Sequence, residues 1–123
     1  MKKKTIPIFI VDDDQSFGSS LQFMLSCRGM RVDWFESAHA FLDSVPSGQK
    51  GIAIVDIQMS LFDGFSLLDQ MKVLGYTMPV ILTTGTTGPD TRDMAIAHGA
   101  LGFLQKPFLE GSLMAIIESL ERR

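Results

Sequence analysis

Five short apolar runs alternate along the chain with five amphipathic helical patterns. The apolar runs span residues 8–11, 32–35, 52–55, 80–82 and 100–104. The helical patterns lie between and after them, with apolar residues mostly three or four positions apart, in segments 17–25, 41–45, 65–71, 94–97 and 113–120. Most of the runs are apolar almost throughout, which is typical of strands covered on both faces. Strict alternation of this kind predicts parallel strands joined by right-handed helical crossovers.

The predicted fold class is therefore α/β, a flavodoxin-like doubly wound (βα)5 three-layer sandwich with parallel sheet order 2-1-3-4-5. The chain has 123 residues, which fits a single domain with one core. Helix boundary signals agree with the pattern: candidate N-caps are Asp14 or Ser16, Ser37 and Asp90, and glycines that can follow helix ends are Gly29, Gly75 and Gly99.

Composition excludes several classes of protein. The net charge of −3 provides no basic surface for nucleic acid, and no apolar stretch approaches the roughly 20 residues of a membrane span. We therefore expect a cytoplasmic protein without direct nucleic-acid or membrane binding. The single cysteine, Cys27, lies within a helical pattern and is predicted to be a buried thiol. Met24, Met71, Met94 and Met114 are predicted to fill the core.

Polar residues follow four of the predicted strands. Asp12 and Asp13 come after the first strand, Asp56 after the third, Thr83 and Thr84 after the fourth, and Lys106 after the fifth. In an open parallel sheet, the ligand crevice lies beyond the carboxyl ends of the strands, where the strand order reverses. The order 2-1-3-4-5 places strands one and three side by side, so we expect these residues to surround one crevice.

Three carboxylates at that point would repel one another by a few kcal/mol at an effective dielectric near 20. An acidic run alone is more often a solvated turn with one member capping a helix, but Asp56 adds a third charge from another strand. The oxygen-only ligand set, without His or Cys, favours Mg²⁺ over other cations. Lys106 and Thr84 would be ordinary surface and strand-end residues alone, whereas here they can contact a phosphate.

These motifs together resemble the receiver (CheY-like) domain of two-component response regulators, most closely the FixJ-like branch that often carries a LuxR-type DNA-binding domain. The resemblance covers essentially the whole chain. It rests on the segments 8–14, 54–59, 63–64, 79–85, 99–100 and 106–108.

The resemblance implies a role for each site residue. Asp56 would be the phosphoacceptor, Asp13 a direct Mg²⁺ ligand and Asp12 a ligand acting largely through water. The backbone carbonyl of Gln58 would complete the metal shell. Thr84 and Lys106 would contact the phosphoryl group.

The resemblance also implies a switch. Phe103 would move with Thr84, the Lys106–Pro107 bond is commonly cis in the family, and Gln58 and Thr86 would tune the lifetime of the phosphoryl group. The chain departs from the family in having Ser60 where Pro is usual, which predicts a less rigid loop, and Phe103 where Tyr is common.

The implied function is a phosphoprotein that accepts a phosphoryl group from a sensor histidine kinase and catalyses only its own phosphorylation and dephosphorylation. The face of the fourth helix, fifth strand and fifth helix would then control an output such as transcription, and it is a candidate homodimer interface. Residues 1–123 would form one receiver domain, with an output domain absent from the chain.

Three alternatives compete with this interpretation. A phosphatase of the haloacid dehalogenase type would use Asp12 as nucleophile and Asp14 as acid, but it leaves Asp56 without a role. A flavin-binding module would need hydroxyl and N–H groups after the first strand instead of aspartates. A binding module with a decayed site conflicts with the intact set of site residues.

Overall fold

The computed structural model describes residues 6–60 and 62–122. The strands are β1 (Ile8–Val11), β2 (Val32–Phe35), β3 (Ile52–Asp56), β4 (Val80–Thr84) and β5 (Gly102–Gln105). The helices are α1 (Gln15–Cys27), α2 (Ala38–Ser44), α3 (Gly64–Leu74), α4 (Thr91–Ala97) and α5 (Glu110–Glu121). All strand pairs are parallel, and the sheet order is β2-β1-β3-β4-β5, which confirms the predicted fold.

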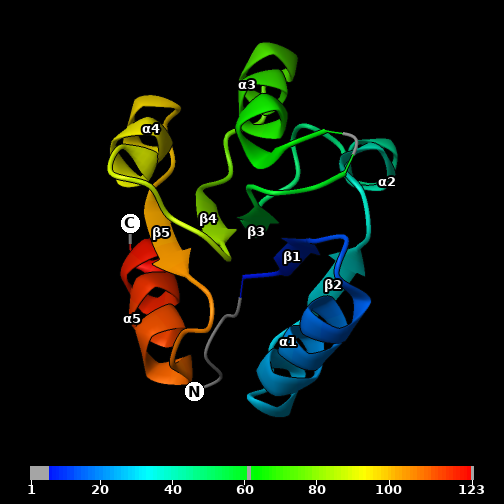
Figure 1. Ribbon diagram of the computed structural model, residues 1–123. Coiled ribbons are helices and arrows are strands. Elements are labelled where there is room, and N and C mark those ends of the chain that lie inside the picture. Colours follow the sequence, from blue (N-terminus) through cyan, green and yellow to red (C-terminus); the bar gives the residue numbers. More distant parts are fainter. Residues whose placement is uncertain (1–5, 61, 123) are drawn as a thin grey trace.

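The sheet is the middle of three layers. In Figure 1, α2, α3 and α4 lie above the sheet, and α1 and α5 lie below it. Successive residues of each central strand point to opposite faces. In β1, Phe9 and Val11 join the core under α2, α3 and α4, while Ile8 and Ile10 join the core against α1 and α5. Burial on both faces explains why these strands are apolar without alternation.

Side chains cap three helices at their N-termini. Asp14 accepts a hydrogen bond from the Phe17 N–H, Ser37 from Ala40, and Asp63 from Ser66. Asp90 occupies the N-cap position of α4 but makes no capping bond with its side chain. Gly75 ends α3 with φ 90°, a left-handed conformation that favours glycine. No helix within the described ranges is both long enough and apolar enough to cross a membrane.

Two burial predictions are wrong. Cys27, the last residue of α1, is exposed, because it lies two positions beyond the buried Leu25 and therefore on the outward face of the helix. The predicted apolar stripe of α4 is also wrong: Met94 is 45% exposed, Ala97 is exposed, and the buried residue of this seven-residue helix is Ala95. Met71 and Met114 are buried as predicted, and Met24 is half-buried.

Candidate functional site

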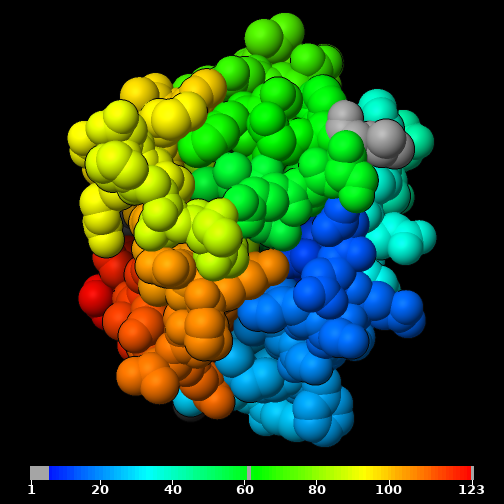
Figure 2. Space-filling model, viewed as in Figure 1, coloured from blue at the N-terminus to red at the C-terminus, as the bar shows by residue number. Residues whose placement is uncertain are grey.

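The carboxyl ends of β1 and β3 bring three aspartates together. The register pairs Val11 with Val55, so Asp12 and Asp56 follow at neighbouring positions. One carboxylate oxygen from each of Asp12, Asp13 and Asp56 lies within 4.8 Å of the others. In Figure 2, the loops after β1 (blue), β3 (green) and β5 (orange) meet near the middle of the face shown. The residues predicted from separate strand ends therefore surround one site.

Local contacts fix the two buried members of this acidic cluster. Asp12 and Asp56 are 1% and 5% exposed, whereas Asp13 is exposed. The Trp34 ring N–H donates to the Asp12 backbone carbonyl at 2.9 Å, which ties β2 to the end of β1. Gly64 lets the chain after β3 pass close to Asp56, since a Cβ there would lie 2.6 Å from the Asp56 carbonyl oxygen.

Lys106 provides the positive charge at the cluster. Its ammonium nitrogen lies 2.8 Å from Oδ2 of Asp12 and 3.4 Å from Oδ2 of Asp56. The same nitrogen is 4.0 Å from the centroid of the Phe17 ring, a cation–π contact. The bond from Lys106 to Pro107 is cis, in agreement with the resemblance.

The net charge of the cluster remains negative, because it holds three carboxylates and one ammonium group, which contacts only Asp12 and Asp56. Burial raises the pKa of Asp56, and the charge of Asp12 raises it further; the Gln58 backbone hydrogen bond and Lys106 act in the opposite direction. A cation added beside Asp56 would relieve both unfavourable effects. The donors are all carboxylate oxygens, which suits a hard divalent cation such as Mg²⁺.

Thr84 is held on the opposite side of Asp56 by the loops after β3 and β4. Its buried hydroxyl donates to the Thr86 carbonyl oxygen at 2.6 Å and lies 3.1 Å from Oε1 of Gln58. The side-chain amide of Gln58 also donates to the Thr86 hydroxyl, and the Gln58 N–H donates to Oδ1 of Asp56. Gln58 therefore bridges the phosphoacceptor candidate and the β4–α4 loop.

Phe103 lies on β5 next to this loop. The side chain is half-buried against the core under α2, α3 and α4, and the Arg92 guanidinium carbon lies 5.6 Å from the centroid of its ring. Arg92 and Phe103 also line a surface cavity of about 370 Å³ together with residues of the β4–α4 loop. The aromatic side chain thus occupies a position from which it can respond to movement of that loop.

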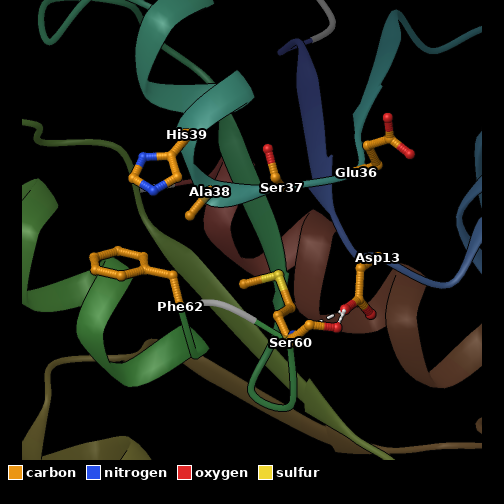
Figure 3. Close-up of a pocket in the computed structure, with 8 residues that line it drawn as sticks. Asp13, Glu36, Ser37, Ala38, His39, Ser60 and Phe62 are labelled. Carbon is orange, nitrogen blue, oxygen red and sulfur yellow. Dashed lines mark hydrogen bonds between the residues drawn. The ribbon is translucent and has the colours of Figure 1, made fainter.

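A contact that the sequence interpretation missed lies on the outer side of the cluster. Ser60 donates to Oδ2 of Asp13 from its backbone N–H and from its hydroxyl, both at 2.9 Å. Figure 3 shows the two bonds beside the labelled residues of a cavity of about 290 Å³. The cavity is lined by Asp13, Glu36, Ser37, Ala38, His39, Met59, Ser60 and Phe62.

The phosphatase alternative conflicts with the position of Asp14. Its side chain accepts the Phe17 N–H and caps α1, so Asp14 is engaged in helix structure instead of facing a substrate. The geometry therefore favours the interpretation that is centred on Asp56.

Comparison with known proteins gives one family. A family model described as a response regulator receiver domain matches residues 8–118. The transcriptional regulatory protein FixJ of Bradyrhizobium diazoefficiens is 37% identical over 116 residues, which are 94% of this chain and 57% of that protein. The response regulator protein TodT of Pseudomonas putida is 32% identical over 119 residues, 97% of this chain and 52% of that protein. The chain thus spans about half the length of these relatives.

Solved structures agree with this result. The crystal structure of FixJ-N superimposes with a TM-score of 0.89 at 30% identity and covers 98% of this chain and 97% of that chain. The response regulator StyR superimposes with a TM-score of 0.86 at 30% identity, covering 94% of this chain and 59% of that chain.

Proposed function

The chain belongs to the response regulator receiver domain family of two-component systems, and on that premise we propose that Asp56 is its phosphoacceptor. Members of this family are signalling domains and not conventional enzymes. The observation that carries the proposal is the cluster of Asp12, Asp13 and Asp56, two members of which, Asp12 and Asp56, contact the ammonium group of Lys106. The haloacid dehalogenase alternative is not favoured by these comparisons.

We propose Mg²⁺ as the cofactor. Asp12, Asp13 and Asp56 would hold it, together with the backbone carbonyl of Gln58. The support is the surplus of negative charge and the all-oxygen donor set, which a hard cation prefers. When bound, Mg²⁺ would neutralise charge on the cluster and on the phosphoryl oxygens.

The proposed reaction needs mainly positioning and charge neutralisation. A carboxylate oxygen of Asp56 attacks the phosphorus of a phosphohistidine or an acyl phosphate, and the bond from phosphorus to the leaving group breaks. The product is an aspartyl phosphate. Lys106, already 3.4 Å from Asp56, would stabilise the negative charge of the transferring group. Asp56 needs no general base, because its ionised carboxylate is itself the nucleophile.

The switch proposed for this domain begins at Thr84. A phosphoryl group on Asp56 offers new acceptor oxygens, so the Thr84 hydroxyl would leave the Thr86 carbonyl and Gln58 to bind them. Phe103 would then move into the space that Thr84 leaves. The consequence would appear on the face formed by α4, β5 and α5, the proposed homodimer interface, where Met94 and Ile96 of α4 are exposed.

The wider role rests on the relatives. We propose that residues 1–123 act as one receiver domain, that a sensor histidine kinase is the phosphoryl donor, and that the output is transcription, as the name of the FixJ relative states for that protein. Direct binding of nucleic acid by this domain is not part of the proposal. A cytoplasmic location stays a prediction.

The decisive experiment incubates the protein with Mg²⁺ and acetyl phosphate and measures the intact mass. We expect the mass of one added phosphoryl group in the parent, and no addition in Asp56→Ala or in the parent after chelation of divalent cations. Modification that persists in Asp56→Ala would refute Asp56 as the acceptor. Sustained hydrolysis of a phosphate ester by Asp56→Asn would instead revive the phosphatase alternative.

A further inference from the structure

Ser60 connects two parts of the acidic site that are distant in sequence. It lies in the β3–α3 loop, four residues beyond Asp56, and it contacts Asp13 at the end of β1. Both of its donors, the backbone N–H and the hydroxyl, point to the same oxygen of Asp13 at 2.9 Å, as the dashed lines in Figure 3 show. The segment that carries the phosphoacceptor is therefore tied directly to a second carboxylate of the cluster.

The residue type at this position determines whether the contact exists. Proline, which the family resemblance leads one to expect after Met59, has neither an N–H nor a hydroxyl and can form neither bond. On the proline ring alone, a chain with Ser60 at this position is expected to have a less rigid loop. The structure instead gives this loop two hydrogen bonds that proline would exclude.

Asp13 is the member of the cluster that most needs such support. Asp12 and Asp56 are buried and share Lys106, whereas Asp13 is exposed and carries a like charge beside them. Repulsion from two neighbouring carboxylates would turn an exposed side chain outward into water. Its oxygen nevertheless lies within 4.8 Å of ligand atoms on both neighbours. The two Ser60 donors oppose the repulsion, because hydrogen bonds to a charged acceptor are among the stronger ones.

We propose that Ser60 is a positioning residue for the divalent cation site. It holds the Asp13 carboxylate, before any cation binds, in the orientation in which it can act as a ligand. This inference rests on the proposed function. Because the carboxylate is already oriented, binding loses less side-chain freedom and needs no reorganisation of the loop. Partners that orient metal ligands in this way typically change metal affinity about 10–100-fold when they are removed.

The test is a Mg²⁺ titration without any phosphoryl donor. Trp34 is the only tryptophan of the chain, and its ring N–H donates to the Asp12 carbonyl, so its fluorescence reports on the cluster. Calorimetry of the same samples measures binding independently of that signal. Ser60→Ala removes the hydroxyl bond and Ser60→Pro removes both. We expect Mg²⁺ binding weaker by about threefold to tenfold in the first variant and by more than about tenfold in the second.

Two controls distinguish the positioning of Asp13 by Ser60 from a nonspecific effect of losing a surface hydroxyl. Ser66→Ala removes another exposed hydroxyl, in the first turn of α3, and should leave Mg²⁺ affinity unchanged. In an Asp13→Asn background, Ser60→Ala should weaken binding no further, since the charge that it positions is gone. Urea denaturation of each variant monitors folding.

The outcomes distinguish this inference from the proposed function. Unchanged or tighter Mg²⁺ binding in both Ser60 variants, with normal binding by the parent, overturns the role of Ser60 and leaves Asp56 as the phosphoacceptor. A parent protein that binds no Mg²⁺ overturns the proposed cation site and the Ser60 inference together.

Discussion

The ammonium nitrogen of Lys106 lies closer to Asp12, at 2.8 Å, than to Asp56, at 3.4 Å. Both carboxylates are buried, and Lys106 itself is only 16% exposed in its side chain. This lysine therefore stabilises the fold of the site, in addition to the contact with the phosphoryl group that we propose for it. Replacing Lys106 should therefore change the free energy of unfolding even in the absence of a phosphoryl donor.

We predict that Lys106→Met destabilises the protein by about 2–3 kcal/mol without divalent cation, because it leaves two buried carboxylates unpaired. Saturating Mg²⁺ should restore a large part of this loss, since the cation replaces the missing positive charge. Urea denaturation of parent and variant, each with Mg²⁺ and with a chelator, measures both effects. A loss that is equal with and without Mg²⁺ would contradict a shared role of lysine and cation.

A second prediction follows from the raised pKa of Asp56, whose causes are burial first and the charge of Asp12 second. A carboxyl group whose pKa is higher in the folded than in the unfolded state holds its proton more tightly when folded. Its contribution to stability is therefore fully present below its usual pKa of 3.8 and is lost as pH rises through the folded value. At neutral pH, the ionised carboxylate of Asp56 destabilises the fold.

Asp56→Asn should accordingly be more stable than the parent at pH 7, by about 1–3 kcal/mol. This is below the roughly 4 kcal/mol between two bare charges 4 Å apart at an effective dielectric of 20, because Lys106 offsets part of the repulsion. The difference should shrink as pH falls toward 4 and also when Mg²⁺ is added to the parent at pH 7. Denaturation curves over this pH range provide the measurement. If Asp56→Asn were less stable than the parent at pH 7, the ionised Asp56 carboxylate would stabilise the fold, contrary to the prediction.

The contact between Gln58 and Thr86 leads to a third prediction. The side-chain amide of Gln58 donates to the Thr86 hydroxyl, and Oε1 of Gln58 accepts a hydrogen bond from the Thr84 hydroxyl. Gln58→Ala and Thr86→Ala should each change the rate at which the phosphoryl group is lost while leaving phosphorylation intact. Because the two side chains act as a pair, the double variant should deviate from the product of the single effects. Decay rates identical to the parent in both single variants would refute the prediction.

Two adjacent threonines on β4 should respond oppositely to loss of their hydroxyl groups. Thr83 is buried, and its hydroxyl has no hydrogen-bond partner among the residues that the structure describes, whereas the Thr84 hydroxyl donates to Thr86. An unsatisfied buried hydroxyl is destabilising by roughly 1–3 kcal/mol, so Thr83→Val should stabilise the fold by about 1 kcal/mol or more. Thr84→Val should destabilise it by about 1 kcal/mol. Thermal unfolding of both variants measures the two changes in stability. If Thr83→Val were destabilised, the Thr83 hydroxyl of the parent would have a hydrogen-bond partner.

The sheet order and the assembly of the acidic cluster could be predicted because both follow from topology. Five alternating strands and helices restrict the crossovers, and the sheet order then requires that Asp12 and Asp56 end neighbouring strands. Periodicity failed for α4 because a helix of seven residues has fewer than two full turns, too few to distinguish Ala95 from Met94 as the buried residue.

Side-chain hydrogen bonds were beyond sequence reasoning for a different reason. Ser60 and Asp13 are 47 positions apart, and only the packed loops determine that the serine faces the aspartate. The Thr84 hydroxyl was expected near a phosphate, but its orientation in this structure is set by acceptors in two loops, Gln58 and Thr86. Residue types indicated which groups gather at the site, while the contacts between them needed coordinates.

The last prediction concerns the glycine that begins α3. A Cβ on Gly64 would lie 2.6 Å from the Asp56 carbonyl oxygen and 2.9 Å from the Ile57 Cα, both backbone atoms that cannot rotate away. Gly64→Ala should therefore destabilise the fold by about 1–3 kcal/mol, the usual range for overpacking, and weaken Mg²⁺ binding by displacing Asp56.

Gly111 in α5 is the matched control, because a Cβ there meets nothing within 4 Å among the residues that the structure describes. Gly111→Ala should stabilise the protein by about 0.5–1 kcal/mol through helix propensity and leave Mg²⁺ affinity unchanged. Urea denaturation and Mg²⁺ titration of both variants measure the contrast. If Gly64→Ala matched Gly111→Ala in both measurements, the close approach of α3 to β3 could not be what fixes the position of Asp56.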